Sequence, residues 1–312
     1  MTAGGSKRSQ RLLSLAPNVS MILFALGADQ AVVGRTQYCV ASIRDYLGTW
    51  QLFGEETIAR LAHWEALPDV GAWPRADHER AASLRPDMVL TSGSGPFDTH
   101  EASMFGLQPE ALINFDTRTL ADLDRQILTI GEIVGRPEAA RELVAQLAER
   151  RDGVLAQWQM PAGCPAILFE YCICIKYHPD PARRRANPGR FIMVGGYLAP
   201  ELIRLCGGKP LLARPGDAVA WVDFNSIRDA RPDMILAFDC RDCPNALLHP
   251  VATRQGWPEM TAVSGHAAYR PRRNIANPNL CYPSALAELA ELVTIWDDAR
   301  RENLINPING SI

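Results

Sequence analysis

The chain contains two nearly identical stretches, Leu84–Gly93 (LRPDMVLTSG) and Ala230–Asp239 (ARPDMILAFD), which begin 146 residues apart. In each copy, Pro86 or Pro232 removes a backbone donor and keeps the preceding residue out of the right-handed helical region, so a preceding helix ends there. The apolar runs that follow are continuous rather than alternating, as in parallel strands covered by helices. The two stretches therefore predict two equivalent joints between a helix and a buried strand.

A second pair of similar segments lies upstream of these joints. Ser20–Arg35 and Ala199–Arg214 each predict an amphipathic helix, a glycine at its C-terminal end and a further apolar piece. The spacing from that glycine to the proline of the joint is 59 residues in the first copy and 25 in the second. The chain therefore predicts two related α/β lobes, the first of which carries an insertion.

A long helix is predicted between the two lobes, over Arg136–Met160. Pro137 stands at a helix-start position, and the apolar residues that follow recur mostly at helical spacing. About 22 helical residues would span roughly 30 Å, so a stiff rod joins the lobes. The expected organisation is a disordered N-terminus (1–10), an N-terminal lobe (11–135), a backbone helix (136–160), a C-terminal lobe (161–296) and a tail (297–312).

Composition restricts the class of protein. The chain has 312 residues, 47% of them hydrophobic, which is enough for two globular domains with substantial cores. Its net charge of -3 gives no electrostatic reason to expect nucleic acid or an anionic membrane as a partner. No run approaches the roughly 18 to 20 apolar residues that a membrane span needs, so we expect no membrane insertion.

The N-terminal segment has one feature of a signal peptide, because basic residues precede an apolar run. Pro17 and Asn18 interrupt that run, and no small-residue cleavage site follows it, so we expect the first strand and helix of the fold instead. As given, the sequence predicts a cytoplasmic protein. A chain trimmed of its leader would read the same and would be periplasmic.

Several segments carry a resemblance to a known family. They are RLLSLAPNVSMILFALGADQAVVGRTQYC, VGAWPRADHERAASLRPDMVLTSG, GGYLAPELIRLCGGKPLL, IRDARPDMILAFDC and GWPEMTAVSGHAAYRPRRN. From about Arg11 to Trp296 the chain resembles the class III (helical-backbone) solute-binding proteins, in particular those that bind cobalamin for the vitamin B12 ABC importer and their iron-chelate relatives. The resemblance implies two Rossmann-like lobes with mainly parallel central sheets, one long backbone helix and a ligand cleft between the lobes. It implies an ABC permease as partner only if a signal peptide exists upstream.

The loops after the strands contain the candidate ligand-binding residues, because open α/β sheets bind ligands at the carboxyl ends of their strands. Aromatic side chains suit a large flat ligand such as a corrinoid or an iron chelate. A buried carboxylate needs a ligand or an arginine as partner, and the basic run PARRRANPGR is either a site for ligand carboxylates or phosphates or a solvated loop. The candidates are Tyr38, Trp73, Phe97, Glu170, Tyr171, Arg190, Tyr197 and Trp221.

Eight cysteines are too few for a disulfide scaffold in a chain of this length, yet several follow strands. The Cys-x-x-Cys spacing of FDCRDC lets two thiolates bind one soft metal or an iron–sulfur cluster, or form a redox pair. The plainer interpretation is that the cysteines are small buried hydrophobic residues, above all Cys164 and Cys206. The candidate metal ligands are Cys39, Cys172, Cys174, Cys240, Cys243 and Cys281.

Two functional hypotheses follow. The first is a solute-binding-fold protein that holds a metal-containing small molecule, a corrinoid or an iron chelate, between its lobes. The alternative is a cytoplasmic metalloprotein whose cysteines bind an iron–sulfur cluster or a soft metal. No nucleophile elbow, P-loop, His-Glu-x-x-His or Gly-x-Gly-x-x-Gly motif occurs, so we do not expect an enzyme.

Overall fold

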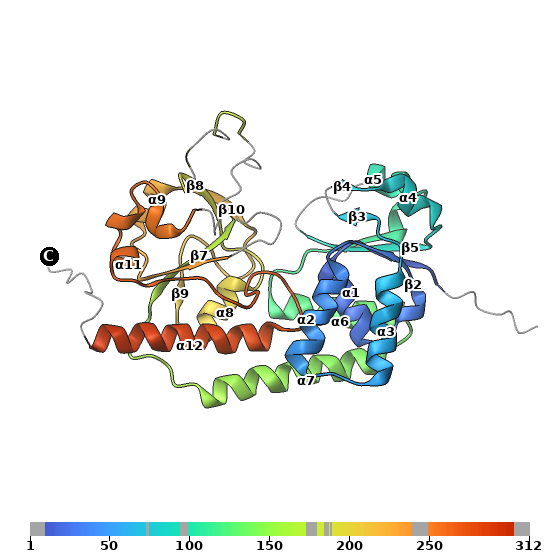
Figure 1. Ribbon diagram of the computed structural model, residues 1–312, viewed down its shortest axis with the longest axis horizontal. Coiled ribbons are helices and arrows are strands. Elements are labelled where there is room, and N and C mark those ends of the chain that lie inside the picture. Colours follow the sequence, from blue (N-terminus) through green and yellow to red (C-terminus); the bar gives the residue numbers. More distant parts are fainter. Residues whose placement is uncertain are drawn as a thin grey trace, which may run out of the picture. The chain divides into compact units, whose positions relative to one another are not determined.

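The computed structural model describes residues 10–72, 75–93, 99–172, 180–183, 187, 189–238 and 249–302. The chain divides into two compact units. Unit 1 consists of Met1–Thr117, Ala121–Ala148 and Asn279–Cys281, and unit 2 consists of Arg118–Leu120, Glu149–Pro278 and Tyr282–Ile312. Each unit holds one main sheet with helices around it, which confirms the predicted pair of α/β lobes (Figure 1).

Unit 1 is built on a four-stranded parallel sheet in the order β2-β1-β5-β6. Figure 1 shows α1, α2 and α3 on the opposite side of this sheet from α4 and α5. The long spacing in the first copy of the repeat is filled by α2, α3 and the β3–β4 hairpin. The elements are β1 (Leu12–Ser14), α1 (Pro17–Ala25), η1 (Asp29–Ala31), β2 (Val32–Arg35), α2 (Cys39–Trp50), α3 (Glu55–Ala66), β3 (Gly71–Ala72), β4 (Arg75–Ala76), α4 (His78–Ser83), β5 (Met88–Ser92), α5 (Thr99–Met104), η2 (Pro109–Ala111), β6 (Leu112–Phe115) and α6 (Leu120–Ile133).

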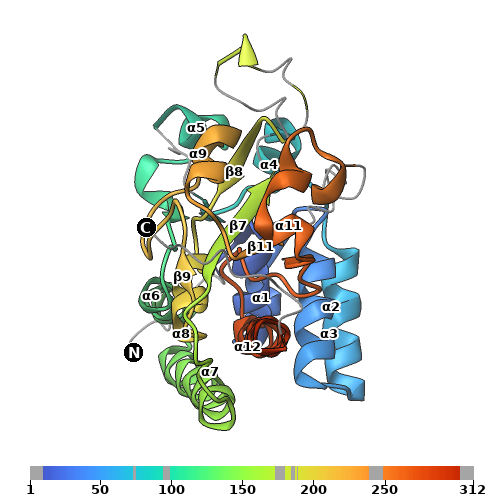
Figure 2. The ribbon, with the colours of Figure 1, turned by 90° about the vertical axis from the view of Figure 1, so that its left-hand side faces the viewer.

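Unit 2 contains a sheet in the order β10-β8-β7-β11-β12, and β9 also pairs with β7. The pairs that β7 makes with β9 and β11, and β11 with β12, are parallel, whereas β8 is antiparallel to both its neighbours. In Figure 2, α9 and α11 lie on the other side of this sheet from α8 and α12. The elements are β7 (Ala166–Cys172), β8 (Phe191–Val194), α8 (Ala199–Leu205), β9 (Lys209–Pro210), β10 (Ala220–Asp223), α9 (Phe224–Asp229), β11 (Met234–Ala237), η5 (Val251–Thr253), η6 (Trp257–Glu259), α11 (Thr261–Ser264), β12 (Ala268–Tyr269) and α12 (Tyr282–Arg301).

The two Arg-Pro-Asp-Met joints begin in the same way. Asp77 caps α4 and Asp223 caps α9, each by accepting a hydrogen bond from the backbone N–H three residues further on. Both helices are six residues long. The residues before the two prolines, Arg85 and Arg231, then adopt left-handed backbone conformations with φ of 47° and 50°. The proline therefore ends both helices through the same turn.

The aspartate of each joint holds the start of the neighbouring strand. The Asp87 carboxylate accepts the backbone N–H of Arg11 at 2.9 Å, and the Asp87 N–H donates to the Arg11 carbonyl at 2.8 Å. Asp233 makes the same two bonds with Ala166, both at 2.8 Å. The motif occurs twice because each copy aligns the second parallel strand of its sheet with the first.

Two long helices complete the chain. Helix α7 (Pro137–Gln157) begins in unit 1 and ends in unit 2, in the position where a joining helix was predicted. The sequence predicted a tail from Asp297, whereas α12 continues to Arg301. Asp297 explains the continuation, because its buried carboxylate accepts the Ala162 N–H at 3.2 Å and pairs with Arg301 at 2.6 Å.

Unit 1 is not made of one continuous segment. Its last piece, Asn279–Cys281, follows most of unit 2 in the sequence. The indole of Trp50 donates to the Leu280 carbonyl at 3.2 Å, and the Leu280 N–H lies 3.3 Å from the Met21 sulfur. Both contacts are buried, so this short segment is part of the core of unit 1.

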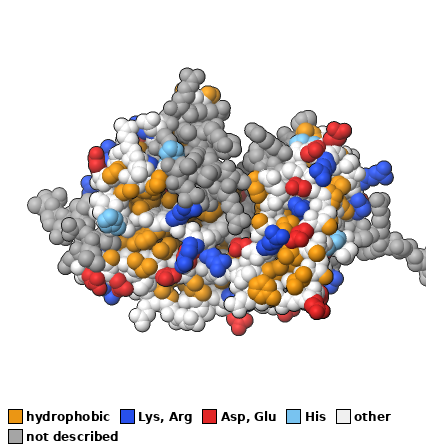
Figure 3. Space-filling model, in the orientation of Figure 1, with side chains coloured by type: hydrophobic (Ala, Val, Ile, Leu, Met, Phe, Trp, Pro, Cys, Tyr) orange, Lys and Arg blue, Asp and Glu red, His pale blue; other side chains and the backbone are white. Residues whose placement is uncertain are grey.

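Over the described part of the chain, hydropathy and charge are the features that bear on a membrane or a charged partner. Within the described residues, no helix combines the length and the apolar character needed to cross a membrane. On the face drawn in Figure 3, basic and acidic side chains lie near one another, with hydrophobic side chains scattered between them.

Candidate functional site

An aromatic cluster lies at the carboxyl ends of β7 and β11 in unit 2. The ring of Tyr171 is 6.2 Å from that of Phe238, nearly parallel at 22°, and 5.7 Å from that of Tyr197. The Tyr171 hydroxyl donates to the side-chain carbonyl of Asn277 at 3.1 Å. All four side chains are partly exposed. Tyr171, Tyr197 and Phe238, called the aromatic cluster below, form an apolar surface where α/β sheets commonly bind ligands.

The backbone that carries Tyr197 is unusual. Gly195, Gly196 and Tyr197 have successive φ values of 61°, 80° and 49°, all left-handed. A Cβ at Gly195 would lie 2.0 Å from the Cβ of Ala213, and one at Gly196 would lie 2.4 Å from Val219, so both positions require glycine. A left-handed tyrosine is a strained residue of the kind that is enriched at ligand sites. With this backbone conformation the ring of Tyr197 lies beside that of Tyr171.

Glu170 points away from the aromatic cluster. Phe169 and Tyr171, the residues on either side of Glu170 in β7, have rings 6.4 and 6.2 Å from that of Phe238, whereas the Glu170 side chain contacts Arg254. Glu170 therefore lies on the opposite face of β7 from Tyr171. There it forms a two-pronged ion pair with Arg254, one bond of which is 2.9 Å long, and the side chains are 0% and 1% exposed. The Arg254 guanidinium also lies 4.7 Å from the centre of the Trp257 ring and donates to the His249 carbonyl. The partner that this carboxylate needs is therefore an arginine of the same unit.

A polar network lies at the corresponding edge of the sheet in unit 1. Asn18, in the first turn of α1, donates to the Ser92 hydroxyl at 3.1 Å and to the Gln126 side-chain carbonyl at 3.4 Å. The Thr117 hydroxyl donates to the same Gln126 oxygen at 2.8 Å, and the Ser92 hydroxyl donates to the Phe115 carbonyl at 3.1 Å. Asn18, Ser92, Thr117 and Gln126 are called the polar network below.

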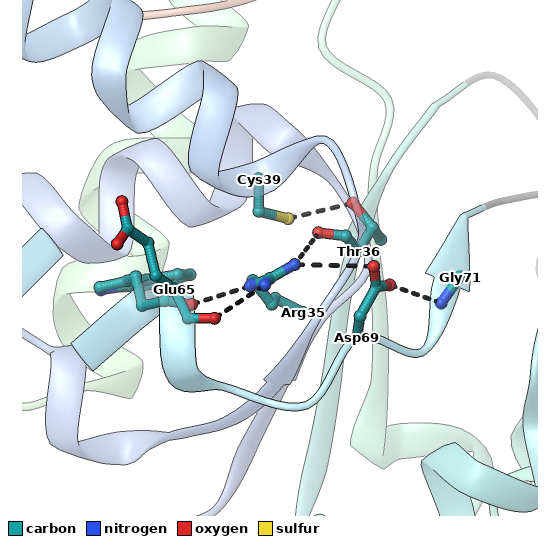
Figure 4. Close-up of polar contacts among 7 residues, drawn as sticks. Arg35, Thr36, Cys39, Glu65, Asp69 and Gly71 are labelled. Atoms are coloured by element: carbon teal, nitrogen blue, oxygen red, sulfur yellow. Dashed lines mark hydrogen bonds and ion pairs between the residues drawn. The ribbon is translucent and has the colours of Figure 1, made fainter. Parts of the chain in front are cut away.

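Cys39 has the surroundings of a core thiol. It is the first residue of α2, fully buried, with its sulfur 3.1 Å from the Thr36 hydroxyl (Figure 4). Burial raises the pKa of the Cys39 thiol, and hydrogen bonds with Ser20 and Thr36 offset this effect only in part. The thiol is therefore protonated at neutral pH, whereas metal ligation requires the thiolate.

Arg35 fixes the segment that leads into the β3–β4 hairpin. Its guanidinium donates to two carbonyl oxygens at the C-terminus of α3, at 2.8 and 3.1 Å (Figure 4). The same group lies 3.8 Å from the Asp69 carboxylate, which accepts the Gly71 N–H at 2.8 Å. One arginine thus ties the end of β2, the end of α3 and the start of β3 together.

The other predicted ligand residues are spread over both units. Tyr38 is partly exposed at the N-cap position of α2. Trp221, in β10, is partly exposed opposite β8, and Arg190 is exposed just before β8. Trp73 and Phe97 lie outside the described residues.

The predicted metal ligands show no metal site in the described part of the chain. Cys39 and Cys281 are buried cysteines of unit 1, and Cys172 is a partly exposed cysteine at the end of β7. Cys174, Cys240 and Cys243 lie outside the described residues. Among the residues that can be described, no group of three or more His, Cys, Asp or Glu side chains could hold a metal ion.

The remaining two cysteines differ from each other. Cys206 is buried as predicted, and burial raises the pKa of its thiol to about 12. Cys164 is exposed, contrary to the prediction, because it lies in the segment before β7 rather than in a core element.

We expect alkylation to separate these thiols. At pH 8 a thiol with a pKa of about 12 is a thiolate in only ~10⁻⁴ of molecules, so Cys206 should react with iodoacetamide at least ~100-fold more slowly than Cys164. Cys39 should be similarly slow because it is buried. Peptide mass spectrometry over a time course measures each rate, and unfolding in urea should make the rates similar. Fast labelling of native Cys39 would contradict its description as a core thiol.

Sequence reasoning missed several residues of these two edges. Phe238 is the last residue of an apolar run that was itself predicted to be a buried strand, and Asn18 was noted as an interruption of the first apolar run. Gln126 offers a weaker signal, because it lies on the apolar face of α6 between Leu123 and Ile130. Asn277 is brought to Tyr171 only by the tertiary fold.

Comparison with solved structures defines the fold class. The periplasmic heme-binding protein RhuT of Roseiflexus sp. RS-1 has a TM-score of 0.65 at 19% identity, covering 93% of this chain and 99% of that one. The periplasmic vitamin B12 binding protein BtuF of Vibrio cholerae has a TM-score of 0.63 at 17% identity, covering 92% and 97%. The fold is therefore that of two-lobed periplasmic binding proteins.

Sequence comparison then gives the family. The family described as "Periplasmic binding protein" matches residues 12–168, about half of the chain, so the chain belongs to the periplasmic binding protein family. An uncharacterised ABC transporter substrate-binding lipoprotein of Bacillus subtilis (strain 168), YvrC, is 24% identical over 95% of this chain and 83% of its own length. The family consists of binding proteins rather than enzymes, and these descriptions give no support to a cytoplasmic iron–sulfur protein.

Proposed function

We propose that this protein binds a metal-containing macrocycle, a corrinoid or a heme-like iron chelate, and delivers it to an ABC permease from outside the cytoplasm. The observation that carries the proposal is the aromatic cluster. Tyr171, Tyr197 and Phe238 present a broad, partly exposed apolar surface at the carboxyl edge of the sheet. Such a surface suits a large flat ligand, because aromatic rings cover much area at little cost in side-chain entropy.

The relatives support this ligand class and the permease. RhuT is described as heme-binding, BtuF as vitamin B12 binding, and YvrC as an ABC transporter substrate-binding lipoprotein. Each of these functions is that of the relative, and for this chain it is part of the proposal. For this chain, the ligand-binding role of Tyr38, Trp221 and Arg190 is part of the proposal.

Absorption titrations with hemin and with cyanocobalamin test the proposed function. We expect one of the two to bind at a 1:1 ratio with a dissociation constant of about 1 μM or below, the range of a well-formed pocket. Binding should shift the visible spectrum of the ligand. Calorimetry under the same conditions provides an independent measure of the stoichiometry. No binding of either compound at about 100 μM protein would overturn the proposed ligand class.

A further inference from the structure

Helix α1 begins at the carboxyl edge of the sheet of unit 1 without a side-chain cap. Its N-cap residue is Ala16, which offers no side-chain acceptor, and its first turn contains no acidic residue. Pro17, at the first helical position, has no N–H to satisfy. The backbone N–H groups of Asn18 and Val19 therefore face the end of the helix, where the helix dipole favours a negative charge. The helix has nine residues, or about two and a half turns.

A second donor beside this helix end lacks an acceptor. Gln126 is 2% exposed, and its side-chain oxygen accepts hydrogen bonds from Asn18 and Thr117. Its side-chain nitrogen is buried, and within the described part of the chain it has no hydrogen-bond partner. Because a buried amide N–H without an acceptor lowers stability, such a group is uncommon in a native protein without a ligand or water at that place.

The Gln126 side-chain amide lies beside the first turn of α1. The Gln126 oxygen is 3.4 Å from the side-chain nitrogen of Asn18, the second residue of the helix, and both Gln126 atoms belong to the same planar amide. The four hydrogen bonds described above for the polar network involve no carboxylate. Ser92 and Gly93, at the end of β5, are partly exposed, so the network reaches the surface at this edge.

We propose that the N-terminus of α1 and the Gln126 side-chain amide together bind an oxyanion, a carboxylate or a phosphate, that is carried by the ligand. The proposal rests on the proposed function, because it specifies a polar group that the bound macrocycle carries. Two backbone N–H groups and one amide nitrogen match the several acceptor oxygens of such an anion. All three donors are uncharged, so they act through their direction and the helix dipole rather than through a full positive charge.

Nuclear magnetic resonance of the unaltered protein is the first test. Inorganic phosphate and acetate are titrated separately into ¹⁵N-labelled protein. We expect the side-chain NH₂ signals of Gln126 and the backbone signals of Asn18 and Val19 to shift together and to saturate. The side-chain signals of Gln146, an exposed glutamine of α7, serve as the internal control. Equal small shifts at Gln126 and Gln146 with both anions would overturn the proposal.

A charge substitution with a matched control gives the second test. Gln126→Glu keeps the acceptor toward Asn18 and Thr117 but replaces the unpaired donor by an oxygen, so at pH 8 we expect it to weaken hemin binding at least ~10-fold. Gln146→Glu makes the same change of charge on the surface and should leave binding unaltered. The dimethyl ester of hemin, which lacks free carboxylates, should bind the unaltered protein about as weakly as hemin binds Gln126→Glu.

The outcomes separate the two proposals. If hemin and its ester bind equally tightly, and Gln126→Glu binds both as the unaltered protein does, the oxyanion site is wrong while the proposed function stands. If phosphate or acetate shifts the Gln126 signals but neither hemin nor cyanocobalamin binds, the oxyanion site stands while the proposed ligand class is wrong.

Discussion

Replacing Glu170 with glutamine is expected to lower the free energy of unfolding of unit 2 by about 3–5 kcal/mol, the usual cost of removing one partner of a buried ion pair. The substitution preserves the shape of the side chain but leaves the Arg254 guanidinium charged, 1% exposed and without its counter-ion. The nearby Trp257 ring compensates only in part, because a cation–π contact contributes less than a two-pronged carboxylate. Urea unfolding followed by hydrogen exchange of the β7 and β11 amides measures the loss.

Two further variants test whether the broken ion pair causes the loss of stability. The double substitution Glu170→Leu with Arg254→Met removes both charges and should recover most of the stability, because well-packed apolar groups often replace a buried pair without loss. Asp229→Asn, which breaks the exposed pair between Arg228 and Asp229 in the same unit, should change stability by less than about 1 kcal/mol. A loss below about 1 kcal/mol for Glu170→Gln would show that the ion pair is not what holds this side of the sheet.

Replacing Tyr171 with alanine is expected to weaken binding of the macrocycle by about 10- to 100-fold. The ring of Tyr171 contacts those of both Tyr197 and Phe238, so its removal divides the aromatic cluster. Loss of one large aromatic contact at the centre of a binding surface commonly costs about 1.5–3 kcal/mol. Absorption titration with whichever of hemin and cyanocobalamin binds the unaltered protein gives the ratio of dissociation constants.

The controls distinguish ring contact from other effects. Tyr171→Phe keeps the ring and loses only the hydrogen bond to Asn277, so binding should fall by less than about 5-fold. Phe53→Ala removes an aromatic ring that is 74% exposed in unit 1 and should leave binding unaltered. If Tyr171→Ala binds the ligand as tightly as the unaltered protein, the aromatic cluster is not the binding surface.

The sequence predicted the fold well because its decisive signals are local. The prolines at 86 and 232 and the apolar runs after them mark the same joint twice, and the structure repeats the joint down to the left-handed residues Arg85 and Arg231. The strand-start contacts of Asp87 and Asp233 could not be predicted, because they join residues more than 60 positions apart. A sequence pattern predicts where a strand begins, but it does not predict which distant backbone groups the first residues of that strand bind.

The candidate site was predictable only in part. Tyr171 and Tyr197 follow from their places near the ends of apolar runs. The orientation of Glu170 depends on which face of β7 meets Arg254, 84 residues away, and the sequence left ligand and arginine as equal alternatives. The surroundings of a helical residue such as Gln126 depend on the loops that its helix covers. The spacing of residues along the sequence does not predict which loops those are.

The divided make-up of unit 1 has a consequence for synthesis on the ribosome. When residues 10–148 have emerged, the unit still lacks Asn279–Cys281, whose backbone satisfies the Trp50 indole and packs at Met21. The first-made lobe therefore cannot complete its core until nearly all of the second has been translated. Domains usually fold one after another during synthesis. Here the earlier domain must wait for the later one, so a translation pause inside unit 2 prolongs the time for which unit 1 is unfinished.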